Sequence, residues 1–384
     1  MTNLSPEIGR RELTLANKIR NLQWGLVLLI ALISSVGFAM LYSAANGNIS
    51  PWASRQMSRF AIALIPMIAA ALIDIRYWFR GAYWLYAGAL ALVVVVDLHG
   101  RTGLGAQRWI NLGGFQLQPS EIMKLALVLA LARYFHCVPD EGPPRLRYLL
   151  VPAGLIAVPT ALVLKQPDLG TAMTLLAAGA VLFYLAGVRL WLFGTGVLAA
   201  AAAAPFAWSV LRPYQKTRLL TFLNPERDPL GAGYHILQSK IAFGSGGLFG
   251  KGFLHGTQSH LSFLPEKQTD FIFTMIAEEL GLVGGLVLLS LYILVLAYAF
   301  AIALRSRSQF GRLLGLGIAV NFSLYAFINM AMVMGLIPVV GVPLPLVSYG
   351  GTAMLTVMWG FGLLMNVGIH RDVLVSRFGQ SRLG

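Results

Sequence analysis

Residues 280–304 read LGLVGGLVLLSLYILVLAYAFAIAL, a run of 25 residues without one charged side chain. A helix that crosses a bilayer needs about 20 consecutive apolar residues, because the hydrocarbon core is about 30 Å thick. At 1.5 Å per residue, this run forms a helix about 37 Å long. The stretch therefore predicts a membrane-spanning helix, and the apolar pattern extends it back to Phe271.

Similar apolar stretches recur along the whole chain. Ten qualify as candidate spans: residues 24–44, 59–73, 82–96, 122–132, 149–164, 171–188, 190–210, 271–304, 313–336 and 350–367. The sequence therefore predicts an all-α integral membrane protein with about ten transmembrane helices, folded as one polytopic domain over residues 1–384. Residues 1–22 and 369–384 would flank the bundle, and residues 211–270 would form a large loop. The alanine run 199–204 is expected to be a packing face of small residues.

Composition supports a membrane protein. Of the 384 residues, 57% are hydrophobic and 11% are charged, whereas about a quarter of the residues in a soluble domain are charged. The mean hydropathy is +0.71. Cys137 is the single cysteine, which excludes an intrachain disulfide, and the scattered histidines show no metal-ligand spacing.

The chain carries 29 Lys and Arg against 15 Asp and Glu, a formal charge of +14. Such an excess is typical of nucleic-acid binding or of basic segments on the cytoplasmic side of a membrane. More than half of the basic residues fall on the side of the bundle that carries both termini: Arg10, Arg11, Lys18, Arg20, Arg76, Arg80, Arg133, Arg145, Arg147, Arg189, Arg305, Arg307, Arg312, Arg371, Arg377 and Arg382. These charges follow the alternation of the spans rather than one patch. We therefore expect no nucleic-acid partner and predict that both termini are cytoplasmic.

The loop 211–270 would lie on the outer side, and it is also basic: Arg212, Lys216, Arg218, Arg227, Lys240, Lys251 and Lys267. Long loops can escape the positive-inside rule, so these charges do not contradict the topology. Within the loop, residues 241–252 read IAFGSGGLFGKG. The glycines could let backbone amides approach a phosphate, or they could serve a tight turn. The residues leave both interpretations open.

Asp270 stands where this loop meets the longest apolar helix. Aspartate is among the best helix N-cap residues, and a carboxylate at the lipid–water boundary is also suited to be a general base. Glu278 and Glu279 lie about 12–13 Å further along the helix. Ionisable groups at that depth are costly in lipid and indicate function, unless the helix begins well outside the hydrocarbon.

Three more segments place polar groups at span ends. Glu121 and Lys124, spaced i, i+3, can pair on one helix face, either as a structural ion pair or as a substrate contact. Asp168 can cap the sixth span. Residues 338–352 read PVVGVPLPLVSYGGT and cannot be regular helix throughout. Irregular backbone near membrane depth requires cover by protein or a watery cavity, so we expect a cavity that opens outward.

Together these segments resemble the SEDS family (shape, elongation, division and sporulation proteins) over nearly the whole chain. The matching blocks, in order, are GAQRWIN (105–111) with QPSEIMK (118–124), KQPDLGT (165–171), NPERDPLGAGYHILQS (224–239), LPEKQTDFIF (264–273) and PLPLVSYGG (343–351). The wording of the last block and of DPLGAGYH (228–235) resembles the elongation members of the family, which serve rod shape, more than the division members.

The resemblance implies an inverting glycosyltransferase of the bacterial cytoplasmic membrane. Its substrate would be lipid II, an undecaprenyl-pyrophosphate disaccharide-pentapeptide, polymerised into peptidoglycan strands. Asp270 matches the family's catalytic aspartate, and Glu121, Lys124, Asp168 and Ser348 would contact or frame the substrate. Cations or a divalent metal (Mg²⁺ or Mn²⁺) would stabilise the departing pyrophosphate. The candidate cations are Arg108, Lys124, Arg212, Lys216, Arg218 and Lys240.

The resemblance also implies partners: a class B penicillin-binding protein as transpeptidase, other membrane proteins of the elongation complex, and the surrounding membrane lipid. Two other functions remain open. A lipid II flippase would need polar groups along a full path across the bilayer, whereas the charged motifs here gather on the outer side. A non-catalytic scaffold of the elongation complex would leave the carboxylates of Asp270 and Glu121 dispensable.

Overall fold

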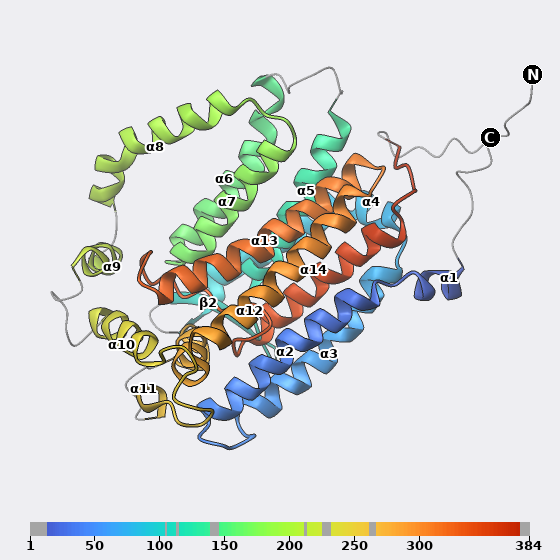
Figure 1. The fold of residues 1–384 in the computed structure, drawn as a ribbon. Helices are drawn as coiled ribbons and strands as arrows, with labels where there is room; N and C mark the ends of the chain where they lie inside the picture. The colour runs from blue at the N-terminus through green and yellow to red at the C-terminus, as the bar shows by residue number, and fades with distance from the viewer. Residues whose placement is uncertain are drawn as a thin grey trace, which may run out of the picture.

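The computed structural model describes residues 14–103, 106–112, 115–138, 146–210, 213–224, 232–260 and 266–376. Long helices dominate it (Figure 1). They are α2 (Trp24–Ala44), α3 (Trp52–Leu72), α4 (Ile75–His99), α5 (Pro119–Cys137), α6 (Leu150–Lys165), α7 (Leu169–Leu185), α8 (Leu190–Val210), α12 (Ile272–Leu304), α13 (Gln309–Val333) and α14 (Gly351–Ile369). Each predicted span is a helix, and several are longer than predicted.

Seven of these helices are long and apolar enough to cross a membrane, and α7 and α8 contribute two shorter apolar helices. The outer helices expose large apolar side chains, such as Trp84 at 82% and Leu150 at 75% of their surface. A soluble protein would bury such side chains, whereas lipid covers them in a bilayer. The chain is therefore a multi-pass membrane protein.

The remaining long helix, α5, is the central one. Glu121, Lys124 and Arg133 interrupt its apolar sequence. It packs against α4, α6, α7, α13 and α14, and these neighbours bury most of its length, including Glu121 and Lys124. Protein rather than lipid surrounds these two charges, which explains how a charged helix can stand inside the bundle.

The two ends of the bundle differ. α1 (Leu15–Arg20) and the residues that follow α14 lie at one end (Figure 1), and a 3₁₀ turn at Leu146–Tyr148 precedes α6. The opposite end carries α9 (Pro213–Leu223), α10 (Ala232–Ser245) and α11 (Thr257–His260). The segment 211–270, which the sequence suggested was a loop, thus contains three helices.

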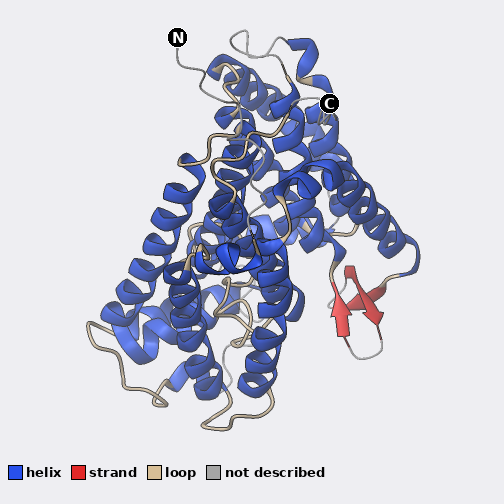
Figure 2. Ribbon diagram, turned by 90° about the vertical axis from the view of Figure 1, so that its right-hand side faces the viewer, coloured by secondary structure: helices blue, strands red, loops and turns tan. Residues whose placement is uncertain are grey.

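A small antiparallel sheet, absent from the sequence prediction, follows α4 and precedes α5 in the chain, and its strands lie at the edge of the helical body (Figure 2). Its strands are β1 (Arg101–Gly103), β2 (Ala106–Leu112) and β3 (Phe115–Leu117), in the order β1-β2-β3. Ile110 pairs with Leu117 in the register of β2 and β3. β1 and β3 have three residues each, too few for a detectable alternation, and the sequence of β2, AQRWINL, does not alternate apolar and polar residues.

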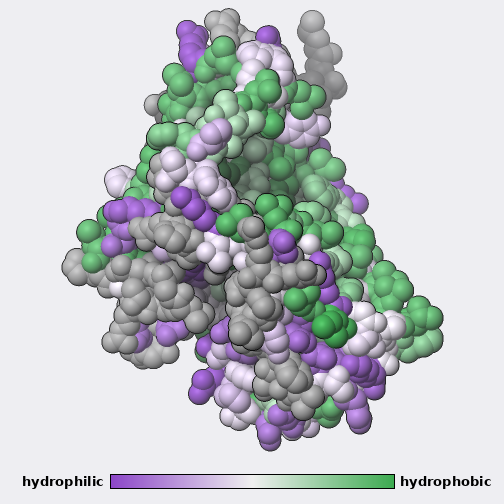
Figure 3. Space-filling model, turned by 90° about the vertical axis from the view of Figure 1, so that its left-hand side faces the viewer, coloured by the Kyte–Doolittle hydropathy of each residue, from purple (hydrophilic) through white to green (hydrophobic). Residues whose placement is uncertain are grey.

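Helix α8 leans away from α6 and α7 (Figure 1). Residues 199–204, the alanine run expected to form a packing face, are all exposed, so that prediction is wrong. Within the described ranges no other helix covers this face, and alanines facing lipid do not need a partner. On the same side of the molecule the surface is hollowed, and hydrophobic residues border the hollow (Figure 3).

Candidate active site

Asp270 lies in the turn 266–271, at the end of the bundle that carries α9, α10 and α11. The helix that follows has its cap position at Phe271, whose side chain has no oxygen to accept from a helix amide. Of the two interpretations of Asp270, the N-cap of this helix is therefore wrong. The capping role does not explain the carboxylate, which is partly exposed.

Two side chains from other segments fix the backbone around Asp270. Asn329 is fully buried on α13. Its Nδ2 donates to the carbonyl oxygen of Asp270 at 2.9 Å and to that of Val342 at 2.7 Å. The hydroxyl of Ser348 donates to the carbonyl oxygen of Thr269 at 2.6 Å. The main chain at residues 269 and 270 is thus tied to α13 and to the segment that precedes α14.

That segment is irregular, as the sequence predicted, and residues 344–348 are buried under the rest of the protein. The hydroxyl of Ser348 accepts from the Leu344 amide at 2.8 Å, and the Gln56 side chain donates to the Ser348 carbonyl at 3.0 Å. A Cβ added at Gly341 would lie 3.4 Å from Oδ2 of Asp270. The carboxylate therefore faces this segment, and the hydroxyl of Ser348, expected to contact substrate, holds backbone on both sides.

Glu121 and Lys124 form the predicted pair, with Lys124 Nζ 2.7 Å from Glu121 Oε1. Both side chains are almost fully buried. Tyr325 of α13 contacts both partners: its hydroxyl donates to Oε2 of Glu121, and Lys124 Nζ lies 4.0 Å from the centre of its ring. Such a pair is held by mutual attraction, a charge-assisted hydrogen bond and a cation–π contact.

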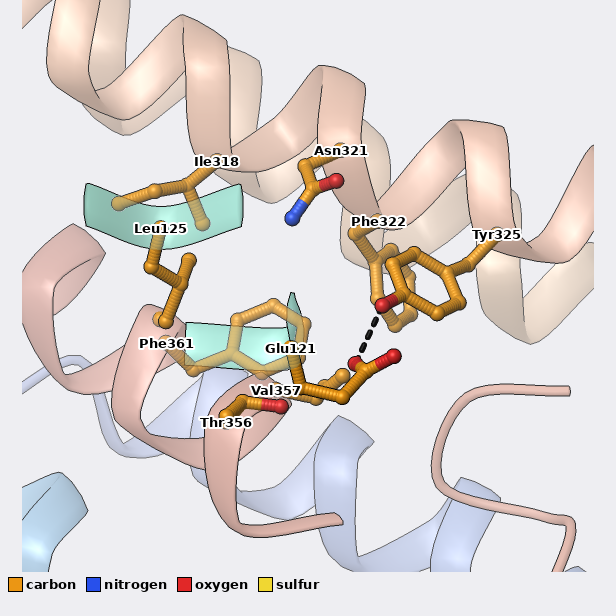
Figure 4. A pocket seen from close by; sticks show the side chains of 10 residues that line it. Glu121, Leu125, Ile318, Asn321, Phe322, Tyr325, Thr356, Val357 and Phe361 are labelled. Carbon is orange, nitrogen blue, oxygen red and sulfur yellow. Dashed lines mark hydrogen bonds between the residues drawn. The ribbon is translucent and has the colours of Figure 1, made fainter. Parts of the chain in front are cut away.

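Glu121 faces a small cavity between α5, α13 and α14 (Figure 4). The cavity has a volume of about 20 Å³, enough for about one water molecule. Asn321 and Thr356 add polar groups to its wall. Asn321, Tyr325 and Asn329 recur every fourth residue, so they share one face of α13. This polar stripe leads from the cavity to the backbone of Asp270.

Arg108 and Asp168, distant in sequence, meet in the structure. Nε of Arg108, on β2, lies 3.7 Å from Oδ2 of Asp168. Asp168 caps α7 by accepting from the Thr171 amide at 3.2 Å and the Thr171 hydroxyl at 2.9 Å, which confirms the predicted cap. Gln118 Nε2 also donates to Asp168, at 3.2 Å. These contacts fasten the sheet and the start of α5 to the start of α7.

The glycine-rich run 241–252 lies against α12. The amides of Lys251 and Gly252 donate to the carbonyls of Glu278 and Glu279, both at 3.0 Å. Gly250 has a φ of +80°, and a Cβ there would lie 2.1 Å from the Glu279 carbonyl oxygen. The glycines thus permit close backbone packing. The tight-turn interpretation is confirmed, because these amides already donate to protein carbonyls rather than to a phosphate.

The two glutamates of α12 have structural partners as well. Oε1 of Glu278 accepts from Lys251 Nζ at 2.8 Å and from the Gln258 amide at 2.9 Å. Glu279 accepts from the Ser43 hydroxyl of α2 at 2.6 Å. Both carboxylates are fully buried, and their partners explain how the protein tolerates them there. Through these contacts the two glutamates link the segment 251–258 to α12, and α12 to α2.

The other basic residues predicted to stabilise the pyrophosphate make fewer contacts with the described site residues. Arg212 lies outside the described residues, and so does the side chain of Arg218 on α9. Lys216 Nζ lies 5.9 Å from the ring centre of Trp208, and Lys240 is exposed on α10. Across the described ranges, no three His, Cys, Asp or Glu side chains are placed to hold a metal ion.

Three residues of this site were missed in the sequence. Tyr325 and Asn329 have a detectable signal, since polar residues every fourth position in an apolar span indicate one polar face. Lys267 shares the turn with Asp270 and is 8% exposed. Burial lowers the pKa of the Lys267 ammonium, and the negative charge of Glu279 opposes that shift. Nothing in the sequence separates Lys267 from the other lysines of the loop.

Residues 19–373 match the family model described as cell cycle protein, FtsW/RodA/SpoVE. The chain belongs to the FtsW/RodA/SpoVE family. This is the SEDS family that the sequence blocks resemble, and the match covers the ten long helices and the Asp270 turn. The peptidoglycan glycosyltransferase MrdB of Escherichia coli K12, a RodA-type member, is 46% identical over 349 residues, which cover 91% of this chain and 94% of MrdB.

Solved structures of FtsW/RodA/SpoVE proteins share the fold. A chain from the structure of a peptidoglycan synthase complex, in which polymerization and crosslinking are coordinated, matches with a TM-score of 0.80 and 35% identity, covering 91% of this chain and 98% of that one. RodA of Thermus thermophilus matches with a TM-score of 0.70 and 31% identity, covering 91% and 97%. The match to the elongation branch predicted from the sequence is thereby confirmed.

Proposed function

We propose that this peptidoglycan glycosyltransferase polymerises lipid II for lateral wall growth, with Asp270 as its general base. The geometry of the turn that contains Asp270 is the main support for the proposal. In a chain 46% identical to a peptidoglycan glycosyltransferase, this carboxylate is partly exposed and its backbone is held by Asn329 at 2.9 Å. A rigidly placed base at the end of a membrane bundle suits a substrate whose sugars project from the bilayer.

The reaction is one displacement. Lipid II carries its pyrophosphate in an α linkage and the product is β-1,4-linked, so the configuration at the sugar C1 inverts. The 4-hydroxyl oxygen of the acceptor N-acetylglucosamine forms a bond to C1 as the C1–oxygen bond to pyrophosphate breaks. Asp270 takes the hydroxyl proton, and the lipid pyrophosphate leaves with the electron pair. Base catalysis of this kind contributes about 10²–10⁴-fold.

The leaving pyrophosphate gains negative charge, which nearby cations stabilise. Arg108, whose side chain is 22% exposed beside Asp168, and the lysines Lys216 and Lys240 supply charge at this end of the bundle. The buried Glu121–Lys124 pair would frame the head group or steady the wall of its site. Mg²⁺ or Mn²⁺ bound with the pyrophosphate would add the same stabilisation.

The distribution of the basic residues supports an orientation of the protein in the membrane. With both termini in the cytoplasm of a bacterial cell, the Asp270 end faces outward across the inner membrane. The hollow, apolar side of the molecule (Figure 3) is suited to an undecaprenyl tail that enters from the lipid. The fold it shares with a chain of a peptidoglycan synthase complex supports a class B penicillin-binding protein as partner.

The test is polymerisation of fluorescent lipid II by the purified full chain, with and without the class B transpeptidase. We expect glycan ladders on a gel that disappear after digestion with a muramidase. Lipid II that crosses a liposome membrane without forming polymer would support a flippase instead. Neither polymer nor transport, with a folded protein and its partner present, would leave only the scaffold.

A further inference from the structure

A second pocket lies at the end of the bundle opposite Asp270. It opens between the start of α2 and the ends of α12 and α14, and its volume is about 310 Å³, within the range of small-molecule sites. Tyr298, Ala301 and Ile302 of α12 form an apolar wall. Gln23, Arg305 and Arg371 form the polar side.

The polar side carries excess positive charge. Arg371 Nε lies 3.3 Å from one oxygen of Asp372, and Arg307 Nε lies 3.3 Å from the other. Within the described ranges, no carboxylate pairs with Arg305. Arg307 and Arg371 thus share one carboxylate, and Arg305 has none among the described residues. Like charges converging on a pocket repel one another, and an anion bound between Arg305 and Arg371 would relieve that repulsion.

The ends of two helices offer another explanation for these arginines, because cations are favourable near helix C-termini. Arg305 is the C-cap residue of α12, and Arg371 follows the end of α14. In the described part of the chain, however, neither guanidinium donates to a carbonyl of either helix. Both therefore keep donors for a ligand, and a guanidinium matches the oxygens of a phosphate.

Gln23 indicates a second chemical group that the ligand would carry. Its Oε1 is buried and has no hydrogen-bond partner among the described residues. A buried carbonyl oxygen without a donor is costly, so a turn of the side chain that brings Oε1 to the pocket wall is favourable when a ligand there presents a hydroxyl or an ammonium N–H. The pocket therefore suits a molecule that carries a phosphate beside a hydrogen-bond donor.

The depth of the pocket in the membrane indicates which kind of phosphate-bearing molecule it binds. α2 begins at Trp24, which is 57% exposed, and α12 ends at Leu304, which is 64% exposed. Exposed tryptophan is typical of the membrane–water interface. The pocket thus lies at the level of lipid phosphates, with lipid-facing helices on its sides. A free phosphate would leave the apolar wall of α12 without a partner.

We propose that this pocket binds one glycerophospholipid, whose phosphodiester is held by Arg305 and Arg371 and whose headgroup donates to Gln23. Phosphatidylglycerol and phosphatidylethanolamine have the required donor, and phosphatidylcholine does not. An acyl chain would lie along Ile302 and Tyr298. This site is separate from the proposed polymerase site and does not depend on its assignment.

The experiment is native mass spectrometry of the purified full chain, delipidated and then supplied with phosphatidylglycerol, phosphatidylethanolamine or phosphatidylcholine of identical acyl chains. We expect one tightly retained lipid, with the choline lipid the weakest. The double variant R305A/R371A should lower retention of phosphatidylglycerol about ten- to thirtyfold, as expected for two arginines near a lipid phosphate. The control R189A/R312A removes two exposed arginines from the same end, outside the pocket, and should retain the lipid.

Gln23→Met keeps the length of the side chain and both arginines, and it should abolish the preference for donor headgroups over choline. Equal retention by R305A/R371A and by the control would overturn the proposal. So would equal binding of all three lipids by the unaltered protein. A separate arm supplies inorganic phosphate at millimolar concentration. If phosphate displaces the lipid at that concentration, the pocket is a free-anion site and the lipid assignment is wrong.

Discussion

The side-chain amide of Asn329 holds the main-chain oxygen of Asp270 at 2.9 Å. One turn earlier on the same helix, the hydroxyl of Tyr325 donates to the carboxylate of Glu121. Residues four apart lie on one helix face, so a single face of α13 contacts the proposed base and the buried ion pair. A shift of α13 would move both, which makes this helix the element that sets the geometry of the site.

The Asn329 contact predicts a loss of turnover without a loss of binding. Asn329→Leu keeps the branching of the side chain but removes the donors to Asp270 and Val342. We expect kcat to fall about 10²-fold, as for a misplacement of about 1 Å at a reacting group, with KM for lipid II nearly unchanged. Steady-state polymerisation of fluorescent lipid II measures both quantities.

The chain provides a matched control at its other end. Asn366 of α14 is also fully buried, and its Nδ2 donates to the carbonyls of Ala70 and Ala71 at 3.1 and 3.0 Å. Asn366→Leu should lower the melting temperature by a similar amount and preserve kcat. If both variants lose activity in proportion to stability, Asn329 has only a structural role.

Asp270→Asn tests the base itself. Asparagine has the same shape as aspartate, but it cannot accept a proton from the acceptor hydroxyl. We expect a folded, membrane-inserted protein whose polymerisation is reduced about 10²–10⁴-fold. Glu266→Gln, at an exposed position of the same turn, serves as the control and should remain active. If Asp270→Asn forms nearly normal amounts of polymer, Asp270 is not the base, and Glu266 or Asp168 becomes the candidate.

The ten helices could be predicted because lipid imposes one simple rule. Every span must be helical and mostly apolar, and the run 280–304 satisfies that rule without tertiary information. Asp168 could be read as a cap because capping is local, within three residues of Thr171. Both predictions depend on short stretches of sequence, which is why they were confirmed.

The parts that could not be predicted depend on contacts between distant segments. The cap interpretation of Asp270 failed because the helix begins two residues later, at Ile272, a boundary that sequence patterns do not fix. The role of the glycines in 241–252 depends on their packing against α12. The role of Asn329 depends on its hydrogen bond to the Asp270 carbonyl. No local pattern reveals such partners, because Lys251 and Glu278 are 27 residues apart and Asn329 and Asp270 are 59 residues apart.

Cysteine labelling tests the orientation in the membrane. Lys240 and Arg307 are both exposed, and they stand at opposite ends of the bundle. In a Cys137→Ser background, Lys240→Cys should react with an impermeant maleimide applied to spheroplasts, and Arg307→Cys should react only after lysis. The physical reason is that the termini end, which carries most of the arginines, stays inside. Reversed accessibility of the two sites would contradict the proposed orientation.

Gly250 and Gly244 form a pair that tests the packing of the outer segment on α12. A Cβ at Gly250 would lie 2.1 Å from the Glu279 carbonyl oxygen, and its φ is +80°, whereas a Cβ at Gly244 meets nothing within 4 Å. Gly250→Ala should destabilise the protein by more than about 1–2 kcal/mol, the cost of the left-handed backbone alone. Gly244→Ala should be nearly neutral. Equal melting temperatures would show that the segment can leave α12.

The Glu121–Lys124 pair can be tested so that stability and activity separate. Glu121→Gln leaves Lys124, only 2% exposed, without its carboxylate, and breaking a buried pair costs about 3–5 kcal/mol. The double variant Glu121→Gln/Lys124→Met removes both charges, so its melting temperature should recover toward that of the unaltered protein. Its polymerisation should stay low, because a head group framed by this pair loses a cation and an anion whatever the stability of the fold. If activity instead returns together with the melting temperature, the pair is only a structural bridge, and the contacts to lipid II must come from Arg108 and the outer lysines.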